Sequence, residues 1–105
     1  MDDVNIKFCF LYRDAANFKN YGKVIFSNPI NLTLEQVQRS LVSNLIDGEY
    51  FYADKWKVPD LHSFIYNSQL DHDFHEFRCV ELTNERPTVQ RTVDEFLQLI
   101  SFPNQ

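Results

Sequence analysis

Glycine is nearly absent from this chain. Only Gly22 and Gly48 occur among 105 residues, whereas loops that cradle phosphates need several glycines at fixed spacing. This scarcity excludes a GxGxxG dinucleotide loop and a Walker loop. The GxSxG turn that presents a serine nucleophile is missing as well, so no known motif for nucleophilic catalysis is present.

Positive charge is also in short supply. The chain carries 10 lysines and arginines against 15 aspartates and glutamates, which gives a formal net charge of −5. No run of basic residues occurs anywhere. Because phosphate neutralisation dominates nucleic-acid affinity, domains that bind DNA or RNA usually carry a basic stripe. We therefore expect no nucleic-acid partner.

Long apolar runs and paired cysteine motifs are absent too. No stretch approaches the roughly 18 apolar residues of a membrane span, and Asp2 and Asp3 stand where a signal peptide needs positive charge. Cys9 and Cys79 lie far apart in apolar neighbourhoods, without CxxC spacing. We predict a cytoplasmic protein without membrane contact. In that reducing compartment the two cysteines are expected to be buried thiols that act as small apolar residues.

Aromatic residues, in contrast, are abundant. Ten phenylalanines, five tyrosines and one tryptophan can each bury roughly 150 to 250 Å², which is enough for a compact core. Residues 5–12 predict a strand with Ile6, Phe8, Phe10 and Tyr12 on one face. Residues 23–27 predict a second strand, antiparallel to the first across a long polar loop.

Two capping boxes predict helices. Thr33 is followed by Gln36, and Thr92 by Glu95, at the spacing that caps a helix start. Apolar residues then recur at helical spacing up to Ile46 in the first segment and up to Ile100 in the second. Glycine at 48 and proline at 103 are expected to end these helices.

The remaining segments complete the predicted fold. Residues 49–56 are aromatic enough for a strand but also fit a short helical turn, and residues 62–66 fit another short strand. Residues 72–82 have strand composition, with a bulge expected near residues 77–78 because the apolar parity changes there. Residues 1–105 are thus predicted to form one α+β domain of two layers. It contains an antiparallel sheet of three to five strands, with two amphipathic helices packed on it.

The segment 70–77, LDHDFHEF, concentrates residues that bind metals. His72, His75 and Glu76 are candidate ligands for a divalent ion, which His62 or Asp60 could complete. In a strand, however, neighbouring side chains point to opposite faces, so the two histidines would point apart. The alternative is a half-buried strand in which His75 is packed and hydrogen-bonded, and the histidine order HxxHE differs from the HExxH of metalloprotease helices.

Two further segments are candidate binding sites. The polar loop carries Arg13, Asp14, Asn17 and Lys19, which predict recognition of an anionic group or a partner backbone. The alternative is a solvated turn whose polar side chains hydrogen-bond to their own backbone.

The second segment, residues 50–56, contains Tyr52 and Trp56. Aromatic residues of this kind mark interfaces as often as they fill a small core, so both interpretations stay open.

Four segments together, YRDAANFKNYG, FSNP, DGEYFYADKWKVPDL and DHDFHEF, resemble a family of small uncharacterised bacterial proteins. The resemblance spans most of the chain and implies a bacterial cytosolic setting and a stand-alone domain. It implies no activity, ligand or catalytic residue.

The leading functional expectation is a non-enzymatic binding or regulatory module that contacts a protein partner or a second copy of itself, without a cofactor. One alternative is a metal-binding protein or metal-dependent hydrolase that uses the segment around His75. A small-ligand binder that uses Arg13 and Lys19 is another.

Overall fold

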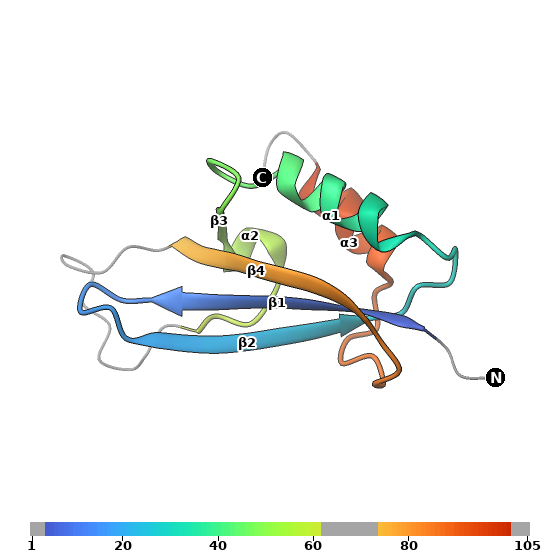
Figure 1. Ribbon diagram of the computed structural model, residues 1–105, viewed down its shortest axis with the longest axis horizontal. Helices are drawn as coiled ribbons and strands as arrows, with labels where there is room; N and C mark the ends of the chain where they lie inside the picture. The colour runs from blue at the N-terminus through green and yellow to red at the C-terminus, as the bar shows by residue number, and fades with distance from the viewer. Residues whose placement is uncertain (1–3, 62–73, 102–105) are drawn as a thin grey trace.

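A computed structural model of the protein describes residues 4–61 and 74–101 (Figure 1). Its elements are β1 (Asn5–Arg13), β2 (Lys19–Phe26), α1 (Leu34–Ser43), β3 (Tyr50–Tyr52), α2 (Ala53–Trp56), β4 (Phe74–Thr83) and α3 (Val93–Ile100). The strands form one antiparallel sheet in the order β2-β1-β4-β3. The predicted α+β class with an antiparallel sheet of three to five strands is therefore confirmed.

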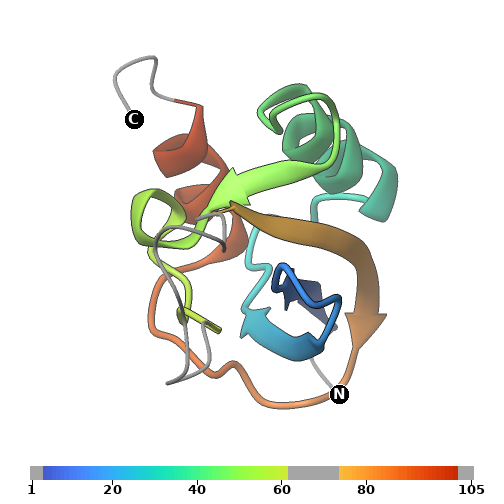
Figure 2. The same cartoon turned by 90° about the vertical axis from the view of Figure 1, so that its left-hand side faces the viewer.

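The helices pack on one face of the sheet, as the view along the strands shows (Figure 2). This face carries Ile6, Phe8, Phe10 and Tyr12 of β1, each at most 1% exposed, as the alternation in residues 5–12 predicts. Phe8 lies at the centre of the core. Its ring is stacked on that of Phe10 and lies 5.5 Å from that of Phe96 in α3. Burial of these rings is the main force that holds the helices on the sheet.

The β1–β2 hairpin is longer than the sequence predicts. Strand pairing continues to Arg13 and Lys19, so the loop is only residues 14–18. The Asp14 carboxylate makes this tight loop possible because it accepts hydrogen bonds from the backbone of Ala16 and Phe18, both at 2.9 Å. Asn17 adopts a φ of 68°, a left-handed conformation that asparagine tolerates well. The predicted long loop over residues 13–22 is wrong.

Both capping boxes are present and start α1 and α3 where the sequence places them. Helix α1 ends at Ser43 with Asn44 as its cap, so Ile46 lies beyond the helix. Ile46 instead forms an isolated bridge to Tyr50. Residues 50–56 satisfy both predictions for that segment, because β3 leads directly into the single-turn helix α2. This turn adds a third helix to the two predicted, while the strand expected at 62–66 lies outside the described residues.

Strand β4 occupies the described part of the segment predicted to be extended, and it contains the expected bulge. Cys9 lies opposite Cys79, whereas the next residue, Phe10, lies opposite Phe77. One extra residue on β4 is therefore accommodated between residues 77 and 79. The bulge allows Phe77 and Val80 to pack against the same core, although their numbers have different parity.

Candidate functional site

Two of the candidate metal ligands, His75 and Glu76, lie in the described residues, and their side chains point to opposite faces of the sheet. The His75 side chain is 1% exposed, and its ring lies 5.8 Å from that of Phe51. Its Nε2 accepts a hydrogen bond from the backbone N–H of Leu61 at 2.9 Å and lies 3.6 Å from Asp60 Oδ1. His75 is thus a packed and hydrogen-bonded residue, as the alternative to a metal ligand predicts.

Glu76 points to the opposite face and forms an ion pair with Arg13, with 2.9 Å between Oε2 and Nε. Because His75 and Glu76 diverge, they do not share a ligand centre. His62 and His72 lie outside the described residues. In residues 4–61 and 74–101, no three histidine, cysteine, aspartate or glutamate side chains are close enough together to hold an ion.

The residues of the predicted recognition loop bind mainly to one another. Arg13 donates a hydrogen bond to Asn17 Oδ1 at 2.8 Å in addition to its pair with Glu76. The Asp14 carboxylate is engaged by the loop backbone. Lys19 is exposed on β2 and lies opposite Arg13 in the strand register. This geometry matches a self-contained turn, and the loop residues are positioned to stabilise the hairpin.

The two aromatic candidates have different environments. Trp56 is 4% exposed and stacks on Phe51 at 4.6 Å, so it is a core residue and is not available to a partner. Tyr52 is half-buried and packs on Phe74 at 5.0 Å, on the face of the sheet away from the helices. An adjacent cavity of about 600 Å³ is lined by Arg13, Glu49, Tyr50, Phe74 and Glu76.

One edge of the sheet is closed by another part of the chain. Along β2, the N–H of Ile25 donates to Thr88 Oγ1 and its carbonyl accepts from the N–H of Thr88, both at 2.9 Å. The carbonyl of Ser27 accepts from Val93 at 2.8 Å. Residues 84–92 therefore run beside the end of β2, where Thr88 satisfies both backbone groups of Ile25.

In the described residues, strand pairing covers only the start of the outer edge of β4. Strand β3 pairs with Phe74–Glu76, and the N–H of Phe77 donates to the carbonyl of Glu49 at 2.9 Å. Beyond residue 77, no strand in the described part of the chain pairs with the outer edge of β4.

Which backbone groups face this edge follows from the strand register. Backbone groups of alternate residues point to opposite edges of a strand. The N–H and C=O groups of Ile25 point away from β1, so its partner in β1, Lys7, directs its own backbone groups towards β4. By alternation, the backbone groups of odd-numbered residues of β1 point to β4 and those of even-numbered residues point to β2. Cys79, Glu81 and Thr83 therefore bond to β1, and Val80 and Leu82 direct their N–H and C=O groups outward.

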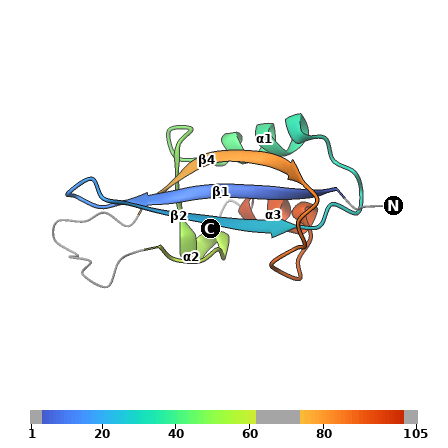
Figure 3. The same cartoon turned by 60° about the horizontal axis from the view of Figure 1, so that its bottom comes forward.

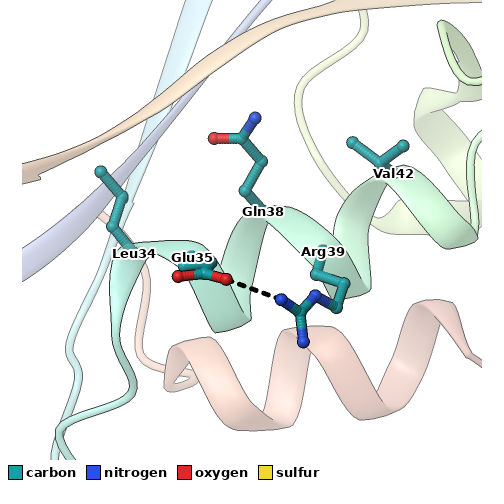
Figure 4. Close-up of a pocket in the computed structure, with 5 residues that line it drawn as sticks. All are labelled: Leu34, Glu35, Gln38, Arg39 and Val42. Carbon is teal, nitrogen blue, oxygen red and sulfur yellow. Dashed lines mark hydrogen bonds and ion pairs between the residues drawn. The ribbon is translucent and has the colours of Figure 1, made fainter.

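Helix α1 lies alongside this uncovered edge. Figures 1 and 3 both place α1 next to β4, on the side away from β1, and the two elements are in contact. Leu34, Gln38 and Val42 follow one another at a spacing of four residues and point to the side of α1 on which β4 passes (Figure 4). A shallow groove of about 510 Å³ lies over α1, lined by Leu34, Glu35, Gln38, Arg39 and Val42.

The surface near this edge is apolar. Leu82 is 54% exposed and Val42 is 40% exposed, whereas Glu35 and Arg39 form an ion pair at 2.6 Å on α1. Sequence reasoning missed this site because the signal is tertiary. The alternation Val80-Glu81-Leu82 predicts that this segment is a strand. It does not show that the strand next to it, β3, is only three residues long and ends before reaching Val80.

Comparisons with models of known protein families, with curated proteins and with solved structures found no match to this chain. The resemblance to small bacterial proteins therefore stays a prediction. In the described ranges, no helix combines the length and the apolar character needed to cross a membrane.

Proposed function

We propose that this protein is a non-enzymatic binding module that accepts an extended segment of a partner protein along the outer edge of β4, at residues 78–83. The observation that carries the proposal is that Val80 and Leu82 direct their backbone groups outward, beside the exposed side chains of Leu82 and of Val42 in α1. Proteins generally cover or charge their sheet edges, because an open edge pairs with other chains. Addition of a strand to such an edge is a recurrent mode of peptide recognition.

The side chains around the edge indicate the chemistry of the partner. In an added strand, residues opposite Val80 and Leu82 would point to the face where α1 lies, so apolar side chains are favoured there. The residue opposite Glu81 would point to the other face. Glu81 is exposed, and a lysine or arginine at this partner position would pair with it. The expected partner segment therefore alternates between apolar and basic residues.

A second copy of the chain is a less suitable occupant. An antiparallel two-fold pairing in which Val80 exchanges hydrogen bonds with Leu82 of the copy places each Glu81 directly opposite its counterpart. Like charges at directly opposed positions destabilise a strand pair. The net charge of −5 adds to this repulsion. We therefore assign the edge to a different protein.

The test is a selection from a displayed library of random peptides, followed by amide exchange measured by NMR on the labelled protein. Selected peptides are expected to alternate apolar and basic residues. On binding, exchange of the Val80 and Leu82 amides should slow by about tenfold or more, because they become hydrogen-bonded. The Ile25 amide is already bonded to Thr88 and should not change.

Two variants make the test specific. Leu82→Pro removes the outward N–H and should abolish binding, since proline cannot donate to a ladder. Leu82→Ala keeps that N–H and should weaken binding less. Three results would contradict the proposal: peptides that protect other amides, peptides that bind equally well to Leu82→Pro, and peptides without alternating apolar and basic residues. Concentration-dependent dimerisation that protects the Val80 and Leu82 amides would assign the edge to a second copy of the chain.

A further inference from the structure

The two cysteines, 70 positions apart in sequence, lie directly opposite each other on adjacent strands. The register pairs Cys9 of β1 with Cys79 of β4, and both side chains point to the face of the sheet away from the helices. The backbone alternation described above makes this a hydrogen-bonded pair, in which the Cα atoms lie about 5.5 Å apart. Disulfides form at Cα separations of about 4.4 to 6.8 Å, and this pair lies within that range. Directly opposed Cβ atoms lie about 4.5 to 5.5 Å apart, so they must approach to about 3.5 to 4.5 Å for the bond to form.

The surroundings of the two thiols differ in a way that suits stepwise oxidation. Cys9 is 8% exposed, whereas Cys79 is half-buried and lies 3.8 Å from Glu81 Oε1. Burial, together with the neighbouring Cys79 thiol, raises the pKa of Cys9 to about 11. Because the thiolate is the reactive form, the more accessible Cys79 is the better first nucleophile and Cys9 is suited to resolve the intermediate.

We infer that Cys9 and Cys79 form a redox modification site, which low-molecular-weight disulfides such as glutathione disulfide convert reversibly into a β1–β4 cross-link. The Cys79 thiol loses its proton, and its sulfur attacks the reagent, which releases one thiolate and leaves a mixed disulfide on Cys79. The Cys9 thiol then loses its proton, and its sulfur attacks Sγ of Cys79 and releases the second thiolate. Two protein thiols are oxidised while one reagent disulfide is reduced to two thiols.

This site is independent of the proposed partner strand. The cross-link would join β4 to β1, and the outer edge of β4 lies on the other side of the strand. It would also lie next to the bulge at residues 77–79, where the strand register changes. The oxidised form would therefore hold β1 and β4 in their observed register.

The experiment equilibrates the full chain, under native conditions, in buffers with graded ratios of glutathione to glutathione disulfide. Samples are quenched with acid and alkylated, and free thiols are counted by intact mass. We expect a single step from two free thiols to none, with no glutathione retained, and peptide mapping should recover a Cys9–Cys79 linked peptide. The Cys9→Ser variant should instead retain one glutathione on Cys79.

A matched control keeps two cysteines but moves one of them out of register. In Cys79→Ser/Glu81→Cys, the second thiol lies diagonal to Cys9, at a separation of about 7 to 8 Å with the Cβ atoms somewhat closer, which exceeds the Cβ separation of about 3.5 to 4.5 Å in a disulfide. Its closed fraction should be at least about tenfold lower in the same buffers. The inference is overturned if wild type keeps two free thiols at every ratio, if it retains glutathione on Cys79, or if the control closes as readily.

Discussion

Strands β2 and β4, which lie on either side of β1, differ in what covers their outer edges. Beside β2, Thr88 exchanges two hydrogen bonds with the backbone of Ile25, and the N–H of Val93 donates to the carbonyl of Ser27 just beyond the strand. On β4, the neighbouring strand β3 ends after three residues, and α1 contributes the exposed side chain of Val42 beside β4. In the described part of the chain, the end of β2 therefore has partners for its outward backbone groups, whereas β4 beyond residue 77 has no paired strand on its outer side.

The largest effect is expected from a proline in the closed edge. Ile25→Pro removes the N–H that donates to Thr88 and replaces a side chain that is 2% exposed. We expect a loss of about 3 to 5 kcal/mol in the free energy of unfolding, from the missing bond and the disturbed core. Urea denaturation followed by tryptophan fluorescence measures this. If the free energy of unfolding falls by no more than it does for a substitution of an exposed residue, Ile25 is not bonded and buried at this edge as described.

The Thr88 hydroxyl isolates one hydrogen bond of the same edge. Thr88→Val leaves the Ile25 N–H without its acceptor and should cost about 1 kcal/mol, because water can reach this rim of the sheet. Thr88→Ser keeps the hydroxyl and serves as the control. If the valine and serine variants are equally stable in the same urea titrations, the bond between Ile25 and the Thr88 hydroxyl does not stabilise the fold.

The open edge should tolerate proline. Leu82→Pro deletes an N–H that bonds to no group in the described residues, and the side chain is 54% exposed. We expect the free energy of unfolding to fall by less than about 1 kcal/mol, while peptide binding is lost. The contrast with Ile25→Pro is the sharpest test of the difference between the two edges, and similar losses at both positions would contradict it.

The smallest effect concerns Glu85, which lies in the segment that closes β2. Its carboxylate pairs with Lys7 and Lys23, and these hydrogen bonds lower the pKa of Glu85 to about 2. A carboxyl whose folded pKa lies below its unfolded value of 4.5 stabilises the fold above that unfolded pKa. The contribution is lost as the pH falls towards 2.

Glu85→Gln should therefore be slightly less stable than wild type at neutral pH. The difference should shrink below pH 4.5 and vanish as the pH falls below 2, as urea titrations across this range would measure. The pair is exposed, so the effect is small. A difference that is constant with pH would show that the carboxylate charge is not responsible.

Local patterns predicted most of the elements. The alternation of Ile6, Phe8 and Phe10 identified the buried face of β1, and the two capping boxes located the first turns of α1 and α3. These signals succeed because alternation and capping depend on residues only a few positions apart. The hydrogen bonds of Asp14 to its own backbone were one of the two predictions for this loop. Lys19 was nevertheless placed in the loop, because the polar composition of this segment does not show how far the strand pairing continues.

The candidate sites were harder to predict. Arg13 was identified, but its partner Glu76 lies 63 residues away, and Trp56 was interpreted as a possible interface residue although Phe51 stacks on it in the core. Burial depends on which elements cover a residue, and that information is spread over the whole chain. For the same reason, the opposition of Cys9 and Cys79 could not be read from their separate apolar neighbourhoods.

The amino-acid sequence by itself determined the α+β class, the helix starts, the bulge in β4 and the aromatic composition of the core. These follow from short-range periodicity and from the area that aromatic side chains bury. Only the tertiary structure decided which strand edge lacks a paired strand in the described residues and which two cysteines lie opposite each other. Both depend on strand order and register, which are set by packing between segments far apart in the chain.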